Sequence, residues 1–474
     1  MSRNFLKIFI FLLSSFFLLS NVLYADYVPK YIFYFIGGGL GSSQRQIAEY
    51  FYQNTAKDHK TKLRMNSLAV SGAVTTHSLN SFITDSAAAA TALATGQKTN
   101  NGWISKLPGI RNATSILYAA SMRGYKTALI TNSRLTDPTP AAFYAHNSNK
   151  EDENKIASEL LNSRIDFIAG GGYKHFMSYS SGYDTVRTDN RDIAAELNGK
   201  GYHTFIGKDS SDKFRSILPI NESIKVFASF TKDHMPYEID RINSDEIMKV
   251  PSLDEMTEMA TRLLSLESKF FIVVDGGRID HALKNHDISA SIHEIISFDN
   301  ALQKAYEFKK KHKYFTLIVV TGDHETGGLS LGSATNDNLD FETVTLSKAS
   351  IGDMLSSSIE NTITNDIKKP ADFNSFLEEN MGLIKLSKNE ENIIDKSFSN
   401  MARGIGLEKE SYNSVLNAVS DIINARVGVS WGSTGETATQ IPLSAEGTFD
   451  DLFRGYMDNT DIVKIFANLL GLNM

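Results

Sequence analysis

The sequence predicts an α/β protein, a three-layer sandwich in which a mostly parallel central sheet lies between two layers of helices. Short apolar runs that end in Gly or Asp alternate with longer amphipathic stretches, a pattern typical of parallel strands that helices cover on both faces. The composition is that of an ordinary globular protein, with 42% hydrophobic and 22% charged residues among 474. Because the chain has no internal repeat and only 9 prolines, we expect one large domain over residues 26–474.

The strands are clearest in four apolar runs, which are Tyr31–Ile36, Lys126–Thr131, Phe270–Val274 and Thr316–Thr321. In open α/β sheets, ligands bind at the carboxyl ends of the strands, so the residues that follow these runs are where chemistry is expected. Two of the runs lead into possible metal ligands: Asp275 comes directly after the third, and Asp323 with His324 come one residue after the fourth.

The stretch from about residue 336 to 428 differs from the rest of the domain. It is rich in Ser, Asn, Glu and Lys and has weaker strand signals. We therefore expect a mainly helical insertion or cap, whose function the sequence does not indicate.

The amino terminus resembles a secretory signal over residues 1–25. Arg3 and Lys7 precede an apolar run, Ile8–Leu19, and Ala25 offers a small residue for cleavage. The run is shorter than the span of about 20 residues that a membrane helix needs, so we expect a periplasmic or secreted protein without a stable membrane span after cleavage. An uncleaved anchor stays open as an alternative, because Leu23 is a poor residue at the −3 position.

Charge and cysteine content exclude several classes of function. Asp and Glu number 55 against 48 Lys and Arg, for a formal charge of −7, so there is no basic surplus to hold nucleic acid. The absence of cysteine excludes disulfides, thiolate metal sites and a cysteine nucleophile. Any metal must be held by His, Asp, Glu or hydroxyl groups.

Ser86 stands ahead of an alanine-rich stretch that predicts a helix to about Thr95, ending at Gly96. Two interpretations are open from the local sequence. The serine is either a helix N-cap, which satisfies a free backbone N–H, or a nucleophile, since the positive end of the helix stabilises an alkoxide and an incoming phosphate dianion.

The rest of the chain favours the nucleophile, because six segments resemble, in order, the motif blocks of alkaline phosphatases. The segments are Thr84–Leu93, Leu135–His146, Asp233–Arg241, Asp275–His281, Thr321–Gly328 and Ser433–Gly435. Six blocks in the right order form a far more specific signal than one short motif. The resemblance runs from about Tyr31 to the carboxyl end and implies an alkaline phosphatase-like fold.

This resemblance implies a phosphate monoester hydrolase, and by family likeness a possible homodimer. A serine attacks phosphorus between two zinc ions, with a magnesium site nearby and an arginine that clamps the phosphate; one zinc activates the serine and the other stabilises the leaving alkoxide. The matching positions are Ser86 for the nucleophile and Asp85 for its neighbour, Asp323 and His324 for the serine-activating zinc, Asp280 for the second zinc, Asp137 and Thr139 for the magnesium side, and His281 near the phosphate.

Several positions of the family pattern are replaced in this chain. Where the family has a bridging aspartate, this chain has Gly38, which has no side chain to donate. Where the family has a magnesium-site glutamate, this chain has Asp275, whose side chain is one methylene shorter but can still reach magnesium through water. Where the family has the two histidine ligands of the second zinc, this chain has Lys284 and Glu436. The phosphate-clamping arginine is replaced by Lys150, which keeps the charge but loses the bidentate fork.

These replacements alter the expected metal content. An ammonium cannot bind zinc, whereas Glu436 can donate through oxygen, and His286 is a further candidate, although it points to a different helix face from Asp280. We expect one zinc at most, held by Asp323, His324 and Ser86, and a magnesium site that has lost its bridge. At the second zinc position we expect Lys284 to lie between Asp280 and Glu436 and to replace the ion electrostatically.

Two functions are consistent with these features. The first is a slow alkaline phosphatase that acts through a phosphoserine at Ser86 on small phosphate monoesters. The alternative is an inactive pseudophosphatase that binds phosphorylated ligands or serves as a scaffold. The intact nucleophile block favours the first, and the combined changes at Gly38, Lys284 and Glu436 favour the second.

Overall fold

The computed structural model describes residues 28–109, 111–218, 224–245, 249–332, 338–355, 370–402 and 409–472. The predicted signal at residues 1–25 lies outside these ranges. Within them, no helix combines the length and the apolar character that a bilayer span requires.

A ten-stranded sheet forms the centre of the molecule, in the order β16-β2-β15-β10-β1-β9-β5-β6-β8-β7. The four predicted runs are confirmed as the adjacent parallel strands β10 (Thr316–Gly322), β1 (Tyr31–Gly37), β9 (Phe270–Gly276) and β5 (Lys126–Arg134). β15 (Ile441–Gly447) runs antiparallel to both its neighbours. The other strands of this sheet are β2 (Val70–Thr75), β6 (Phe167–Gly171), β7 (Tyr202–Ile206), β8 (Lys225–Ser229) and β16 (Gly455–Asp458).

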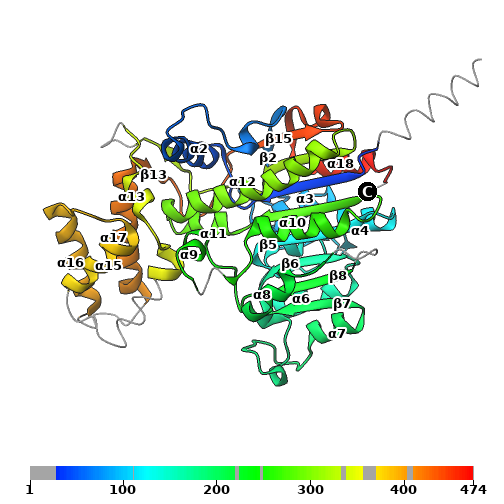
Figure 1. Ribbon diagram of the computed structural model, residues 1–474, viewed down its shortest axis with the longest axis horizontal. Helices are drawn as coiled ribbons and strands as arrows, with labels where there is room; N and C mark the ends of the chain where they lie inside the picture. Colours follow the sequence, from blue (N-terminus) through cyan, green and yellow to red (C-terminus); the bar gives the residue numbers. More distant parts are fainter. Residues whose placement is uncertain are drawn as a thin grey trace, which may run out of the picture.

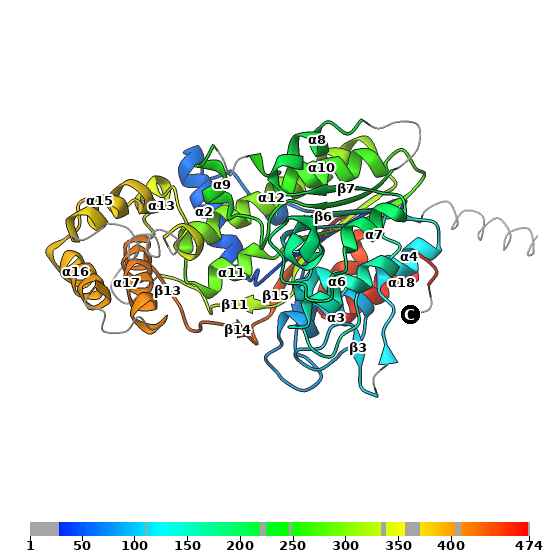
Figure 2. The same ribbon diagram turned by 90° about the horizontal axis from the view of Figure 1, so that it is seen from below.

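Helices cover both faces of the sheet, as the sequence predicts (Figures 1 and 2). Tyr34 on β1 packs into one hydrophobic core and its neighbours Phe33 and Phe35 pack into the opposite one, because successive strand residues face opposite sides. The helices on the Tyr34 side are α3 (Ser86–Thr95), α4 (Ile116–Met122), α6 (Glu153–Glu159), α7 (Ile193–Gly199) and α18 (Asn459–Leu469). Those on the Phe33 side are α2 (Ser42–Ala56), α8 (Ser211–Arg215), α10 (Leu253–Leu264), α11 (Arg278–Lys284) and α12 (Ile288–Lys311).

Strand register brings the predicted site residues to one edge of the sheet. Gly37 at the end of β1 is level with Gly276 on β9 and Gly322 on β10. The segments that leave these three strands therefore start side by side. They carry Gly38, Asp280 and Asp323.

The described part of the 336–428 stretch is largely helical and lies beyond one end of the sheet (Figures 1 and 2). It comprises α13 (Glu342–Leu346), a π-helical turn (Ile351–Leu355), α15 (Pro370–Met381), α16 (Lys388–Ala402) and α17 (Lys409–Val427). Its apolar side chains form a separate core with residues of α2 and α12. The remaining short α-helices and strands are α5 (Pro138–Ala141), α9 (Glu238–Ile242), β3 (Lys106–Leu107), β4 (Arg111–Asn112), β11 (Glu325–Thr326), β12 (Ser330–Leu331), β13 (Val429–Ser430) and β14 (Glu436–Thr437).

Candidate active site

Ser86 is the first residue of α3, and its side chain is not the helix cap. Asp85 is the N-cap: its backbone is extended (φ −108°, ψ 171°) and its carboxylate accepts a hydrogen bond from the Ala88 N–H. The N-cap interpretation of Ser86 is therefore wrong, because the capping position lies one residue earlier. The Ser86 hydroxyl instead lies 3.0 Å from Nε2 of His324.

Asp323 and His324 are buried at the end of β10, opposite the serine. Oδ1 of Asp323 accepts hydrogen bonds from the backbone N–H groups of Gly39 (2.9 Å) and His324 (2.8 Å). Its Oδ2 accepts one from the Thr139 hydroxyl (3.2 Å) and lies 3.5 Å from Nε2 of His324. Burial raises the pKa of Asp323. Oδ2 of Asp323 and Nε2 of His324 thus converge beside Ser86.

Lys284 lies between the two carboxylates that match ligands of the second zinc. Its Nζ is 2.8 Å from Oδ2 of Asp280 and 2.8 Å from Oε1 of Glu436. Burial disfavours charge at each partner, but the ion pairs outweigh it: they raise the pKa of Lys284 and lower that of Asp280. The predicted electrostatic bridge is confirmed in its geometry, because one ammonium contacts both carboxylates.

Asp275, which the sequence resemblance matches to a magnesium ligand, is a fully buried carboxylate. Oδ2 of Asp275 accepts hydrogen bonds from the Thr131 hydroxyl (2.6 Å) and the Ser133 hydroxyl (3.4 Å). Its Oδ1 is buried with no partner among the described residues. Burial raises the pKa of Asp275 well above its usual value. A cation beside Oδ1 would give this oxygen a partner and would offset the cost of burying the charged carboxylate.

Gly38, which the sequence resemblance matches to a bridging aspartate, lies in a crowded position. A Cβ added there would lie 3.1 Å from Cβ of Asp280 and 3.2 Å from Cα of Gly277. These distances are tighter than ordinary carbon contacts. An aspartate at position 38 therefore requires a shift of the neighbouring chain.

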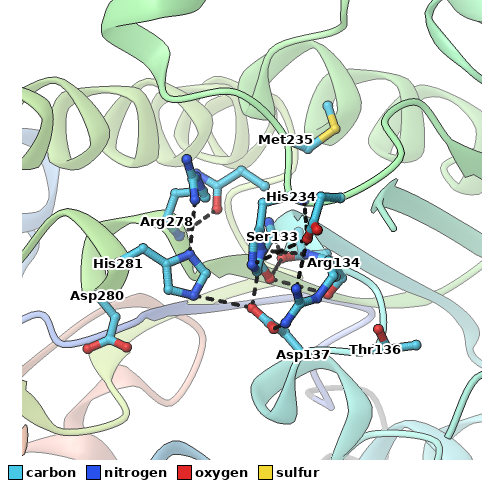
Figure 3. Close-up of polar contacts among 12 residues, drawn as sticks. Ser133, Arg134, Thr136, Asp137, His234, Met235, Arg278, Asp280 and His281 are labelled. Atoms are coloured by element: carbon cyan, nitrogen blue, oxygen red, sulfur yellow. Dashed lines mark hydrogen bonds and ion pairs between the residues drawn. The ribbon is translucent and has the colours of Figure 1, made fainter. Parts of the chain in front are cut away.

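Asp137 and His281 meet a third residue, His234, which sequence reasoning missed (Figure 3). Their ligand atoms lie within 4.8 Å of one another, with Nδ1 of His234 3.6 Å and Nε2 of His281 3.5 Å from Oδ2 of Asp137. The other contacts disfavour a metal, because the Arg134 N–H donates to Nδ1 of His234 (3.2 Å) and the Arg278 guanidinium faces Nδ1 of His281 (3.3 Å). Metal binding through Nε2 of His281 would turn its Nδ1–H towards that guanidinium.

Burial shifts the ionisation of all three residues in this cluster. Burial lowers the pKa of His281 to about 3 and the pKa of His234 well below its usual value. The positive charges of Arg278 and Arg134 lower both pKa values further. Burial raises the pKa of Asp137 to about 6. Both imidazoles are therefore neutral. The only sequence signal for His234 was its place in the Asp233–Arg241 block.

Most of the predicted site residues line a single cavity of about 160 Å³. Lys150 lies at its wall, where Nζ is 3.0 Å from Oδ2 of Asp85. The predicted site residues that line the cavity are Ser86, Asp137, Thr139, Lys150, Asp275, Asp280, His281 and Asp323, together with Lys284 and Gly38.

His286 has a different role from that of a substitute ligand. Its Nε2 is 2.8 Å from the carbonyl oxygen of Ser433, to which it donates a hydrogen bond, and its ring stacks on Trp431 at 4.7 Å between centroids. A nitrogen that donates a proton is not available to bind zinc.

The chain is similar in sequence and in fold to several known proteins. A sequence model described as alkaline phosphatase matches residues 29–472. The repressible alkaline phosphatase of Saccharomyces cerevisiae is 28% identical, with 95% of this chain and 83% of the relative covered. Alkaline phosphatase 3 of Bacillus subtilis is 29% identical, with 94% and 90% covered. The crystal structure of a cold-active alkaline phosphatase from a psychrophilic Shewanella species superposes with a TM-score of 0.78 at 28% identity, with 93% of this chain and 99% of that chain covered.

Proposed function

The chain belongs to the alkaline phosphatase family, and on that premise we propose that it hydrolyses phosphate monoesters with Ser86 as the nucleophile. The observation that carries the proposal is the position of the serine. Its hydroxyl is not used as a cap, lies 3.0 Å from a buried histidine and lines the cavity that also holds Lys150 and Lys284. Family membership supports the reaction class.

The reaction would proceed in two displacements at phosphorus. Oγ of Ser86 attacks the phosphorus, the bond from phosphorus to the ester oxygen breaks, and the alcohol leaves with a proton. Water then attacks the phosphorus of the phosphoserine, the bond from phosphorus to Oγ of Ser86 breaks, and the serine regains a proton from the water as inorganic phosphate leaves. The positive end of the ten-residue helix α3 and the ammonium of Lys150 would stabilise the phosphate dianion during both steps.

One metal ion fits the donors beside the serine. Alkaline phosphatases bind zinc and magnesium. Oγ of Ser86 and Oδ2 of Asp323 lie 3.0 and 3.5 Å from Nε2 of His324, close to the spacing of about 3.4 Å between ligands of a tetrahedral zinc with bonds of about 2.1 Å. We propose that these three residues hold one zinc, which when bound lowers the pKa of the serine hydroxyl.

The other two metal positions of the family differ in their fit. Oδ1 of Asp275, which is buried and has no hydrogen-bond partner in the described part of the chain, suits a magnesium ion near Asp137 and Thr139, although Gly38 supplies no bridge. The second zinc does not fit, because the ammonium of Lys284 contacts both remaining carboxylates. We assign no step of the reaction to that ion.

Turnover of 4-nitrophenyl phosphate tests the proposal. With zinc and magnesium supplied, Ser86→Ala should abolish hydrolysis, and acid quenching of the unchanged chain should trap phosphate on the peptide that contains Ser86. Ser265→Ala, at the exposed end of α10, is the matched control and should retain full activity. Unchanged turnover in Ser86→Ala would contradict the assignment.

A pseudophosphatase is the second candidate, and the Lys284 bridge favours it, since it removes one of the two metals of the family reaction. In that case the chain should bind inorganic phosphate saturably in titration calorimetry without hydrolysing any aryl phosphate. Burst formation of nitrophenol would exclude this candidate.

We also propose that the chain is exported to the periplasm or secreted. The basis is the amino-terminal signal pattern. Sequencing of the mature amino terminus tests it, since cleavage after Ala25 is expected and a retained residue 1 would contradict it.

A further inference from the structure

The hydroxyl of Thr326 connects the Lys284 bridge to the residues beside the nucleophile. Thr326 lies on β11, two residues after His324. Its Oγ1 donates a hydrogen bond to Oδ1 of Asp280 (2.6 Å) and lies 3.1 Å from Nδ1 of His324. Asp280 in turn contacts Lys284 through its other carboxylate oxygen. A continuous chain of contacts therefore runs from Lys284 to Ser86.

The position of each proton along this series of contacts can be assigned from the donors and acceptors present. An ionised carboxylate only accepts hydrogen bonds, so the single hydroxyl proton of Thr326 points to Asp280. Nδ1 of His324 must then donate its proton to the Thr326 oxygen. With Nδ1 carrying the proton, a neutral imidazole has its lone pair on Nε2, the atom that lies 3.0 Å from Oγ of Ser86.

The surroundings prevent the ring from exchanging this arrangement for another. Thr326 and His324 are fully buried and Asp280 is 5% exposed, so water does not compete for their hydrogen bonds. The backbone at Thr326 is held independently, because its N–H donates to Gly39 and its carbonyl accepts from the Gln44 side chain. Gly39 leaves the room for the hydroxyl: with φ at 67°, a Cβ there would lie 2.9 Å from Oγ1 of Thr326.

We propose that Thr326 is a positioning residue that fixes the tautomer of His324, so that the Nε2 lone pair always faces Ser86. The Lys284–Asp280 pair orients Thr326 and thereby supports the nucleophile as well as filling the second metal position. The inference rests on the proposed role of Ser86. The required lone pair is the same whether it takes a metal ion or the serine proton.

Substitutions at Thr326 separate this role from a packing role. Thr326→Val keeps the shape and removes the hydroxyl, whereas Thr326→Ser keeps the hydroxyl and removes a methyl group. For 4-nitrophenyl phosphate we expect Thr326→Val to lower kcat by about 10- to 100-fold, the usual effect of losing such an orienting partner, with little change in KM. Thr326→Ser should restore most of the activity. Thr257→Val, which removes a buried hydroxyl bond in the distant α10, is the matched control.

The tautomer itself is measurable without turnover. In the chain labelled with nitrogen-15 histidine, long-range proton–nitrogen correlation spectra should show His324 protonated at Nδ1, with the signal assigned by its loss in His324→Gln. Thr326→Val should lose that state and Thr326→Ser should keep it.

The outcomes distinguish the two proposals. If Ser86→Ala abolishes activity but Thr326→Val retains full kcat and the Nδ1–H signal, the positioning role is wrong and the nucleophile stands. If Ser86→Ala leaves turnover unchanged, the proposed function fails. A valine variant in which KM alone rises would also contradict positioning.

Discussion

Replacing Lys284 with methionine tests whether its ammonium takes the place of a metal ion. Lys284→Met keeps most of the aliphatic stem and leaves Asp280 and Glu436 close together without a cation. The Asp280 side chain is 7% exposed, Glu436 22% and Lys284 34%. Breaking a fully buried pair costs about 3–5 kcal/mol, and exposed pairs are worth about 0–1 kcal/mol. For this partly exposed bridge we expect a loss of about 1–3 kcal/mol in the free energy of unfolding.

The corresponding shift in melting temperature is small but measurable. An unfolding entropy of about 2.1 cal/mol/K per residue sums to about 1 kcal/mol/K for a chain of this length, so the Tm should fall by about 1–3 °C. Differential scanning calorimetry in the presence of a chelator would measure it. Lys304→Met is the matched control, since Lys304 is similarly exposed and its ammonium lies 2.8 Å from the exposed Glu258.

The pH dependence of this difference follows from the pKa shifts. The lowered pKa of Asp280 stabilises the fold above the pKa of the unfolded chain, and this contribution is lost as the pH falls through the folded pKa. The raised pKa of Lys284 means that its ion pairs stabilise the fold below about pH 10.4, the pKa in the unfolded chain. This contribution is lost only as the pH rises through the folded pKa. The Tm difference should therefore be constant between about pH 5 and 9 and shrink below about pH 4.

A double-mutant cycle with Glu436→Gln isolates the pair. Glu436→Gln should cost stability when Lys284 is present and cost less, or stabilise, when Lys284→Met is also present, because two unpaired carboxylates repel. If the Tm of Lys284→Met equals that of the unchanged chain and the cycle shows no coupling energy, Lys284 does not replace a metal ion electrostatically.

Three further predictions concern metals and buried charge. Elemental analysis should find about one zinc per chain or fewer, and two tightly held zinc ions would show that the ligands are misplaced. The triple change Gly38→Asp, Lys284→His and Glu436→His should raise zinc uptake and turnover, and a triple variant that binds no additional zinc would contradict this expectation. Gly38→Asp alone should lower the Tm, because its Cβ crowds Asp280. Asp275→Asn should raise the Tm of the metal-free chain near pH 8, because burial raises the pKa of Asp275 and its charge opposes folding above the unfolded pKa; a lower Tm in calorimetry would refute it.

The sequence by itself determined the four central parallel strands and indicated most of the candidate site residues. Buried parallel strands are continuous apolar runs, so Tyr31–Ile36 and Thr316–Thr321 could be located without a structure, and they lie within one residue of β1 and β10. The order of the motif blocks indicated Ser86, Asp280 and Asp323. Lys284, four residues after Asp280, lies on the same helix face, which made the ion pair predictable in outline.

Contacts between distant residues were decided only by the tertiary structure. Local sequence allowed Ser86 to be a cap, and the extended backbone at Asp85 decided against it. The meeting of His234 with His281 and the bond from Thr326 to Asp280 have no local signal. Periodicity specifies which face of an element is buried, whereas a hydrogen bond of 2.6 Å depends on strand register and on the room that Gly39 leaves, and both arise only when the sheet is assembled.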